Sequence, residues 1–144
     1  MPRQDPYRNF RFRVEIDGIA TAGFSEVLIG PTTTDVIDYR EGGDPLHVRK
    51  LPGLTKFGNV TLKRGMTNSL DLYKWYQAIS FGQLSGNRRQ VVIVVQDESG
   101  ADQARFVVSE AWPMKYDPSD LNGKGNEVFI ELLELANEGI ERVN

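Results

Sequence analysis

The stretch Phe10–Asp17, which reads FRFRVEID, carries the strongest structural pattern of the chain. Apolar and charged residues alternate through it, as expected for a β-strand with one buried face and one face in water. Asp17 and Gly18 follow as a pair that is typical of a tight hairpin turn. We therefore expect a returning strand from about Ile19 to Ile29, with a bulge or kink at Gly23.

Similar patterns predict more strands along the chain. A β-branched run marks a third strand at Thr32–Tyr39. The last segment, Glu127–Ala136, fits either a strand or a helix, and we favour a strand to about Leu135 followed by a short polar tail. The other expected strands are Asn59–Lys63, Gln90–Gln96 and Ala104–Trp112, the last with an edge or bulge at Pro113. A polar loop is expected at Asp117–Asn126.

One amphipathic helix is expected at Ser69–Ser80. Its apolar stripe has helical spacing and consists of Leu72, Trp75, Tyr76 and Ile79. Asn68 or Ser69 is the expected N-terminal cap, and Gly82 lies just past the end. About seven strands and one helix predict a mainly β fold in a single domain that spans residues 1–144. A sandwich or barrel of packed antiparallel sheets is the expected architecture.

The segment Glu41–Lys56 is expected to be a long irregular loop. It contains Gly42, Gly43 and Gly53, two prolines, and no sustained periodicity. Long irregular connections in compact domains are usually functional or disordered. This one carries its own apolar anchors, which predicts packing against another protein chain. The anchors are Leu46, Val48, Leu51 and Leu54.

The composition excludes several kinds of site. The 144 residues carry a net charge of −3, which argues against a nucleic-acid binder, and the N-terminus and apolar runs predict neither a secretory signal nor a membrane anchor. There is no cysteine and one histidine, His47, so zinc sites and catalytic triads cannot be assembled. The Lys63-Arg64 pair is expected on a solvated face or in salt bridges between subunits. The carboxylates Glu131 and Glu134 are expected on a solvated or lumen-facing strand edge. We expect no enzyme and no cofactor.

Five longer motifs carry a family resemblance. They read YREGGDP (39–45), RKLPGLTKFGNVTLKRG (49–65), LDLYKWY (70–76), AWPMKYDPSDLNGKGNEV (111–128) and IELLELANEGIERV (130–143). Together with the opening DPYRNFRFRVEIDG and AGFSEV (22–27), they resemble the inner-tube proteins of contractile tails, which include T-even-like phage tail tubes and the tubes of extracellular contractile injection systems. The one departure of note is Asn137, where the family often has histidine, and we expect no consequence from it.

The resemblance implies a fold of two packed antiparallel sheets that form a small barrel with one outer helix. It also implies hexameric rings that stack into a hollow tube, which sheath contraction drives through a target envelope. The expected inter-subunit loop residues are Gly42, Gly43, Asp44, Pro45, Leu46, Val48, Arg49, Lys50, Leu51 and Leu54. Asp71, Lys74 and Gln77 are the expected sheath-facing helix residues.

The partners that the resemblance implies are further copies of the chain, the sheath protein, baseplate and tube-initiator proteins, tape-measure and terminator proteins, and a payload of DNA or protein effectors. Assembly is expected in the bacterial cytoplasm, as part of a virion or a phage tail-like particle. Two alternatives stay open. One is a tube-initiator paralogue at the baseplate, and the other is a monomeric β-barrel that binds a ligand.

Overall fold

The computed structural model describes residues 11–19, 24–43, 46–65, 69–118 and 130–144. These residues form nine strands and one helix, with α1 at Asp71–Ser80. The strands are β1 (Arg11–Ile16), β2 (Glu26–Ile29), β3 (Thr32–Tyr39), β4 (Arg49–Phe57), β5 (Val60–Gly65), β6 (Arg89–Gln96), β7 (Asp102–Pro118), β8 (Ile130–Ala136) and β9 (Gly139–Arg142).

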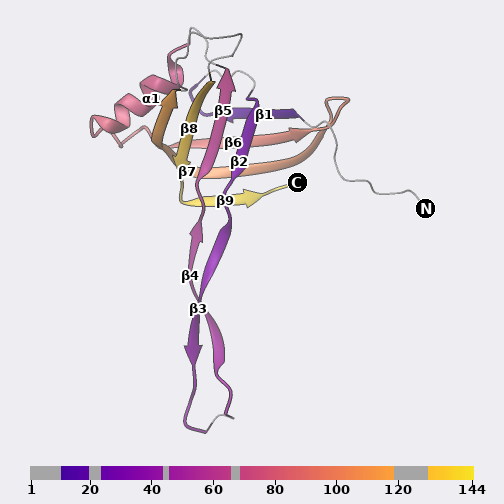
Figure 1. Cartoon of the computed structure of the whole chain (residues 1–144), viewed down its shortest axis with the longest axis vertical. Coiled ribbons are helices and arrows are strands. Elements are labelled where there is room, and N and C mark those ends of the chain that lie inside the picture. Colours follow the sequence, from indigo (N-terminus) through magenta and orange to yellow (C-terminus); the bar gives the residue numbers. More distant parts are fainter. Residues whose placement is uncertain (1–10, 20–23, 44–45, 66–68, 119–129) are drawn as a thin grey trace, which may run out of the picture.

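Two antiparallel sheets make up the body of the molecule. Their strands follow the order β1-β6-β7-β8-β5-β2, and β9 also pairs with β7. In Figure 1 the strands β1, β6 and β9 run across the view, whereas β2, β5 and β8 run along it, so the two sheets cross at a steep angle. The expectation of two packed antiparallel sheets with one outer helix is confirmed. The described strands do not close into a complete barrel, because β1 and β2 each have a single neighbour.

Strand β7 joins the two sheets by changing partners along its length. Its first half pairs with β6 and β9, and from Trp112 onward it pairs with β8. Glu110 lies at this change of partner with a positive φ of 53°, and a register shift follows between Pro113 and Lys115. Bulges of this kind bend a strand and allow it to leave one sheet for another. The predicted bulge at Pro113 is confirmed, but the predicted end of the strand there is wrong.

The core lies between the two sheets and under the helix. Alternating residues of β1 and β6 point inward and meet those of β5 and β8, while Leu72 and Trp75 cover the core from α1. The indole Nε1 of Trp75 donates to the carbonyl oxygen of Asn87 at 2.7 Å, which satisfies its polar group. The buried strand residues include Val14, Ile16, Val60, Leu62, Val91, Ile93, Val108, Leu133 and Leu135.

Four expectations about the pairing or the limits of strands are wrong. β1 pairs with β6 and not with a returning strand. After the turn at Gly18, a single bridge between Ile16 and Ile19 is the only pairing of the expected hairpin among the described residues. The expected returning strand is limited to β2, which pairs with β5, and Gly23 lies outside the described residues. The expected polar tail contains β9, and the start of the expected polar loop at Asp117 belongs to β7.

The two ends of α1 are capped in different ways. The N-terminal cap is Leu70, which makes no side-chain capping bond, and the Oδ1 of Asp71 accepts from the backbone N–H of Leu72 at 2.9 Å. The predicted cap at Ser69 is confirmed in part: Leu70 occupies the N-cap position, but the Ser69 Oγ accepts from the backbone N–H of Asp71 at 3.5 Å. Asn68 lies outside the described residues. Gly82 follows the helix with φ of 81°, as predicted for a C-terminal stop. In the described part of the chain, no helix is long and apolar enough to cross a membrane.

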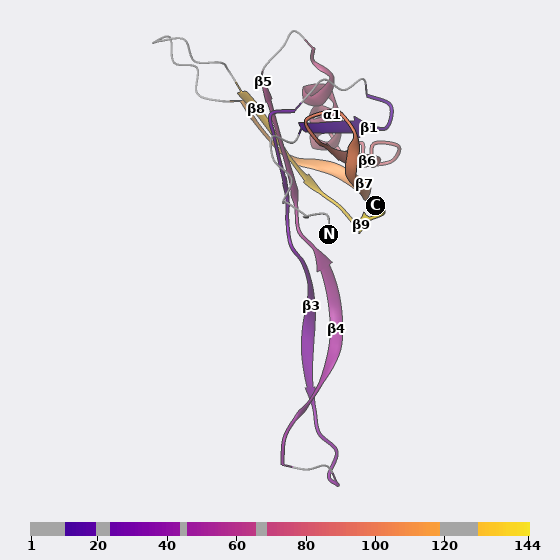
Figure 2. The ribbon, with the colours of Figure 1, turned by 90° about the vertical axis from the view of Figure 1, so that its right-hand side faces the viewer.

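A two-stranded arm extends from the second sheet. We define the arm as β3, β4 and the described residues 40–43 and 46–48 between them. Figures 1 and 2 show it leaving the body from β2 and β5 and projecting well beyond the rest of the chain. The expectation of an irregular loop over Glu41–Lys56 is wrong, because its second half is the strand β4, which pairs with β3.

Candidate assembly surface

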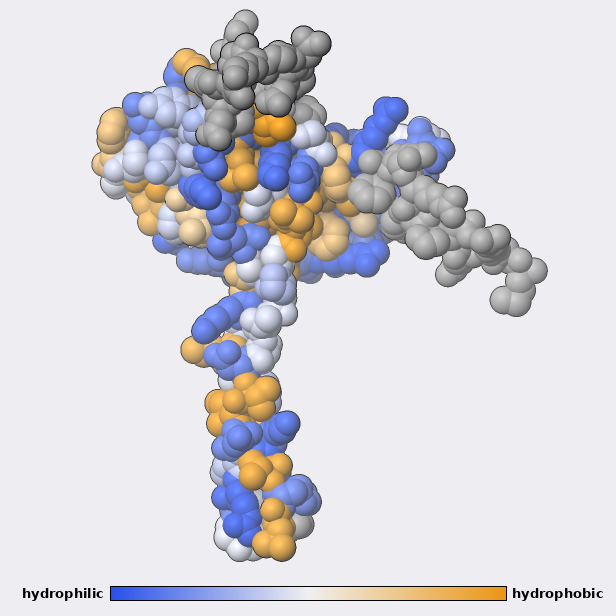
Figure 3. Space-filling view, in the orientation of Figure 1, coloured by the Kyte–Doolittle hydropathy of each residue, from blue (hydrophilic) through white to orange (hydrophobic). Residues whose placement is uncertain are grey.

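The largest group of exposed apolar side chains lies on the arm. All eight residues of β3 are exposed. The exposed fractions of the large apolar side chains on the arm range from 38% for Tyr39 to 95% for Leu46. Figure 3 shows apolar surface distributed along the whole arm. These side chains are Val36, Ile37, Tyr39, Leu46, Val48, Leu51 and Leu54.

The strand register places apolar residues on both faces of the arm. Val36 lies opposite Pro52, and Ile37 lies opposite Leu51. Residues directly opposite each other share a face, whereas successive residues of a strand point to opposite faces. One apolar pair therefore lies on each face of the two-stranded ribbon. A single covering surface would leave one of these pairs in water.

Contacts within the arm contribute little to its stability. The hydroxyls of Thr34 and Thr55 are hydrogen-bonded at 2.9 Å, and Lys56 lies 3.9 Å from the carboxylate of Asp35. Exposed ion pairs stabilise by about 0–1 kcal/mol, and an isolated two-stranded hairpin is marginally stable in water. Complete burial of a fully exposed leucine or isoleucine contributes about 1.5–3 kcal/mol, and burial of a half-exposed one contributes about half as much. Contact with another surface is thus the larger source of stability available to the arm.

The structure places the expected inter-subunit residues along the distal part of the arm. Gly42 and Gly43 lie in its exposed turn, where an added Cβ would meet no atom within 4 Å. Leu46 and Val48 are exposed just before β4. Arg49, Lys50, Leu51 and Leu54 are exposed residues of β4 itself, and Asp44 and Pro45 lie outside the described residues.

Sequence reasoning missed the contribution of β3 to this surface. Val36 and Ile37 were expected within a strand, but not as exposed apolar residues. The available signal was the absence of alternation. Thr32–Tyr39 is β-branched on both faces, without the charged face that β1 has, and this is consistent with a strand covered on two sides.

The expected sheath-facing residues of α1 lie in different environments. Lys74 is exposed, and Gln77 is half-buried. Asp71 is directed to Arg64, with its Oδ1 2.9 Å from the Nη2 of that guanidinium. Asp71 therefore has a defined role inside the subunit.

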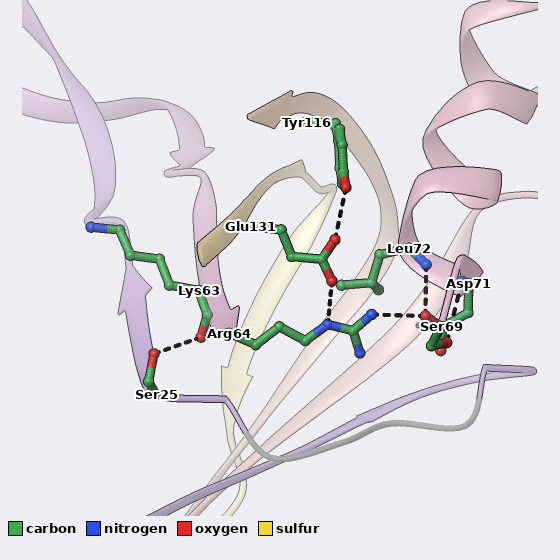
Figure 4. Close-up of polar contacts among 8 residues, drawn as sticks. All are labelled: Ser25, Lys63, Arg64, Ser69, Asp71, Leu72, Tyr116 and Glu131. Carbon is green, nitrogen blue, oxygen red and sulfur yellow. Dashed lines mark hydrogen bonds and ion pairs between the residues drawn. The ribbon is translucent and has the colours of Figure 1, made fainter. Parts of the chain in front are cut away.

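A buried ionic network ties α1 to the second sheet. The Arg64 guanidinium donates through Nε to Glu131 at 2.5 Å and through Nη2 to Asp71, so that β5, β8 and α1 are joined (Figure 4). The Tyr116 hydroxyl donates to the second oxygen of Glu131 at 2.8 Å. Arg64 is 2% exposed and Glu131 is 4% exposed. This corrects the expectation of a solvated face or an inter-subunit salt bridge for Arg64, and of a solvated or lumen-facing strand edge for Glu131.

The network shifts the pKa values of its members in consistent directions. Burial works against the charge on Arg64, but its hydrogen bonds to Glu131 and Asp71 raise its pKa. Burial likewise opposes ionisation of Asp71, but its hydrogen bonds with Arg64, Ser69 and Leu72 and the charge of Arg64 together outweigh burial and lower its pKa. Burial and the bond to Glu131 raise the pKa of Tyr116 to about 12. At neutral pH the network holds a charged guanidinium between carboxylates, capped by a neutral phenol.

The described residues contain no group of three histidine, aspartate or glutamate side chains placed to hold a metal ion. His47 is an exposed residue next to Leu46 on the arm.

The family is shown by a match over nearly the whole chain. The model of the T4-like virus tail tube protein gp19 family matches residues 8–141. The chain belongs to this tail tube family. As a tail tube protein it is a structural subunit of the contractile-tail class, which confirms the resemblance of its motifs.

Solved structures share the fold of this tail tube protein. One is from the tube-terminating cap of the anti-feeding prophage, at 24% identity and a TM-score of 0.83, covering 99% of this chain and 93% of that chain. Another is from the extended sheath–tube complex of PVC, an extracellular contractile injection system, at 22% identity and a TM-score of 0.80, covering 95% and 90%. Hcp1 from Flavobacterium johnsoniae matches at 13% identity and a TM-score of 0.57, covering 92% and 94%. No curated protein matches the chain.

The buried network yields a prediction about stability. Removing one partner of a buried ion pair leaves an uncompensated charge, so we expect Arg64→Met to lower the free energy of unfolding by about 3–5 kcal/mol. The double variant Arg64→Met/Glu131→Leu is expected to lose less than the sum of the two single variants. Urea denaturation, at protein concentrations too low for assembly, measures the free energy of unfolding of each variant.

Arg13→Met is the matched control. Arg13 forms an exposed pair with Glu15 at 3.1 Å, and its removal is expected to cost about 1 kcal/mol or less. Strict additivity of Arg64→Met and Glu131→Leu would contradict the network.

A second prediction concerns alkaline pH. The pKa of Tyr116 is raised from 10.0 to about 12, so between these values the unfolded chain loses a proton that the folded chain keeps. Stability is therefore lost as pH rises above 10. Wild type is expected to lose about 1 kcal/mol more than Tyr116→Phe between pH 9 and pH 11. Parallel denaturation profiles of the two proteins over this range would exclude the shift.

Proposed function

We propose that this chain is the main tube subunit of a contractile tail or injection particle. Six copies form a ring, the rings stack into a hollow tube, and the tube conducts a payload of DNA or protein effectors when sheath contraction drives it through a target envelope. The chain carries out no chemistry. The observation that supports this most directly is the arm, which is apolar on both faces and lies away from its own body.

The arm requires surfaces that its own subunit does not offer. It projects beyond the body in both views (Figures 1 and 2), so its distal apolar residues are remote from the core of the same chain. Coverage of both faces needs two contact surfaces, one for the Ile37/Leu51 pair and one for the Val36/Pro52 pair. Other copies of the chain provide such surfaces at high local concentration, because a tube is built from many identical subunits.

The edges of the body sheets are suited to ring formation. β1 and β2 lie at the two ends of the strand path, each with one neighbour among the described strands. Exposed edge strands readily pair with other strands, and closure into a ring removes them. A contact between unlike surfaces closes into a ring when its rotation permits, and a second such contact along the axis gives a filament. The body edges and the arm supply these two kinds of contact.

The other proposed partners act at the outside and at the ends of the tube. Exposed Lys74, with Gln77 beside it, lies on the outer helix and is offered to a sheath protein. Structures of similar fold come from a baseplate, a sheath–tube complex and a tube terminator, which supports sheath, baseplate and terminator proteins as partners. We propose assembly in the bacterial cytoplasm, as part of a virion or a phage tail-like particle.

Substitutions on the two faces of the arm test this function. Val36→Asp and Ile37→Asp each place a charge on one apolar face, and each is expected to raise the protein concentration needed for assembly by tenfold or more, roughly, because a buried unpaired charge is costly. Thr33→Asp is the matched control at an exposed polar position of β3, with an expected change of about threefold or less. Light scattering and negative-stain microscopy measure the threshold and the particle shape.

The outcomes separate the alternatives. Wild type is expected to form rings at low concentration and long tubes at high concentration. A monomer at every concentration would contradict tube assembly and favour the ligand-binding barrel. Rings that never grow into tubes would favour an initiator at the baseplate. Wild-type assembly by Val36→Asp or Ile37→Asp would contradict coverage of the corresponding face.

A further inference from the structure

The arm meets the body at a joint made of four residues. Gly30 and Pro31 connect β2 to β3, and Gly58 and Asn59 connect β4 to β5. Two backbone hydrogen bonds cross the joint, from Gly30 N–H to the Asn59 carbonyl and from Gly58 N–H to the Pro31 carbonyl, both at 2.9 Å. The arm is thus hydrogen-bonded up to its root and is not attached by a loose linker.

The two glycines allow the backbones to approach closely. A Cβ on Gly30 would lie 2.7 Å from the Asn59 carbonyl oxygen, and a Cβ on Gly58 would lie 2.7 Å from the carbonyl carbon of Gly30. Both distances are shorter than real Cβ contacts, and the opposing atoms are backbone atoms that cannot rotate away. Neither glycine has a positive φ. Glycine is therefore needed at these two positions for the close approach of the two backbones, and not for an unusual backbone conformation.

Pro31 cannot donate a hydrogen bond within the joint. It lies beside Gly58 and accepts from the Gly58 N–H. Proline has no N–H, so it cannot return a bond to the Gly58 carbonyl. Gly58 is half-buried, so its carbonyl is partly withdrawn from water and a protein donor stabilises it.

Asn137 supplies the missing donor from the turn between β8 and β9. Its Nδ2 donates to the Gly58 carbonyl at 2.9 Å, and its Oδ1 accepts from the Gly139 N–H at 3.1 Å. The carbonyl can only accept and the N–H can only donate, so both ends of the amide are fixed by their partners. The short side chain of Asn137 therefore connects the root of the arm to the body sheet through a bond of defined direction.

We propose that Asn137 is a positioning residue that sets the direction of the arm. Together with the Gly30/Gly58 contact, it fixes the angle at which the arm leaves the second sheet and thereby presents the two apolar faces to two neighbouring copies. This inference rests on the proposed tube function. It gives Asn137, which the sequence comparison treated as a minor departure, a specific role in assembly.

Spin labels measure the direction of the arm in the dilute subunit. The chain has no cysteine, so labels can be attached at Thr33→Cys, two residues beyond Pro31 of the joint, and at Lys115→Cys on the body. We expect Asn137→Ala to broaden the distance distribution about twofold or more, since the root of the arm loses a fixed hydrogen bond. A body pair, Lys115→Cys with Glu141→Cys, is expected to keep its wild-type width.

Two matched variants distinguish a specific effect of Asn137 on the arm direction from a general loss of structure at the joint. Asn59→Ala removes a bond from Asn59 Nδ2 to Glu134, at 3.0 Å, and leaves the backbone bonds of the joint, so it is expected to keep the narrow distribution. Pro31→Ala restores an N–H opposite Gly58. In the Asn137→Ala background it is therefore expected to return the distribution toward wild-type width.

Assembly provides the second readout. Asn137→Ala is expected to raise the assembly threshold about tenfold, and Pro31→Ala to recover most of that loss. An unchanged distance distribution in Asn137→Ala overturns the positioning role. A broadened distribution with an unchanged threshold overturns the link to assembly. If wild type itself does not assemble, the proposed function fails, while the distance distributions still test the joint.

Discussion

The structure depends on one constraint. The two-stranded arm has apolar side chains on both faces, and its own chain cannot bury them. Ile37 and Leu51 lie on one face, and Val36 and Pro52 lie on the other. The hydrogen bonds and ion pairs inside the arm are exposed and weak, so burial against other surfaces is the main stabilising term available to it. The proposed assembly meets this constraint, because it converts an exposed and marginal element into a buried one.

The body of the subunit provides a rigid base for the arm. β7 passes from one sheet to the other at Glu110, and a single core fills the space between them. The Arg64 network then fixes α1 against β5 and β8. In the proposed function the tube carries mechanical load, and a subunit whose helix and sheets are joined by buried charge-assisted bonds resists local opening.

The sequence predicted those elements whose pattern is set by their own residues. The alternation in β1, the β-branched run of β3 and the apolar stripe of α1 were all recognised. The helix begins at Asp71 and not at the expected Ser69. The failures concern pairing and context. β1 pairs with the distant β6, which no local turn signal reveals, and β4 was hidden by Pro52 and Gly53. Proline is tolerated there because Pro52 lies on an edge strand, opposite a register shift between Thr34 and Val36.

The candidate site was predicted in outline but not in its details. Leu46, Leu51 and Leu54 were identified from their apolar character inside an irregular composition, and all three are exposed on the arm. The burial of Arg64 and Glu131 was not predicted, because each is charged and only the fold shows that they face each other. Asn137 was overlooked for a similar reason, since its partner Gly58 lies far away in the sequence.

Hydrogen–deuterium exchange of the dilute and the assembled protein tests the central claim most directly. We expect the amides of β3 and β4 to exchange rapidly in the dilute subunit and slowly in the assembled tube, while those of β5 and β8 stay protected in both. Such a change would show that the arm gains its stability from neighbouring copies. Equal protection of the arm in the two states would contradict the claim, because the arm would then be either stable alone or uncovered in the assembly.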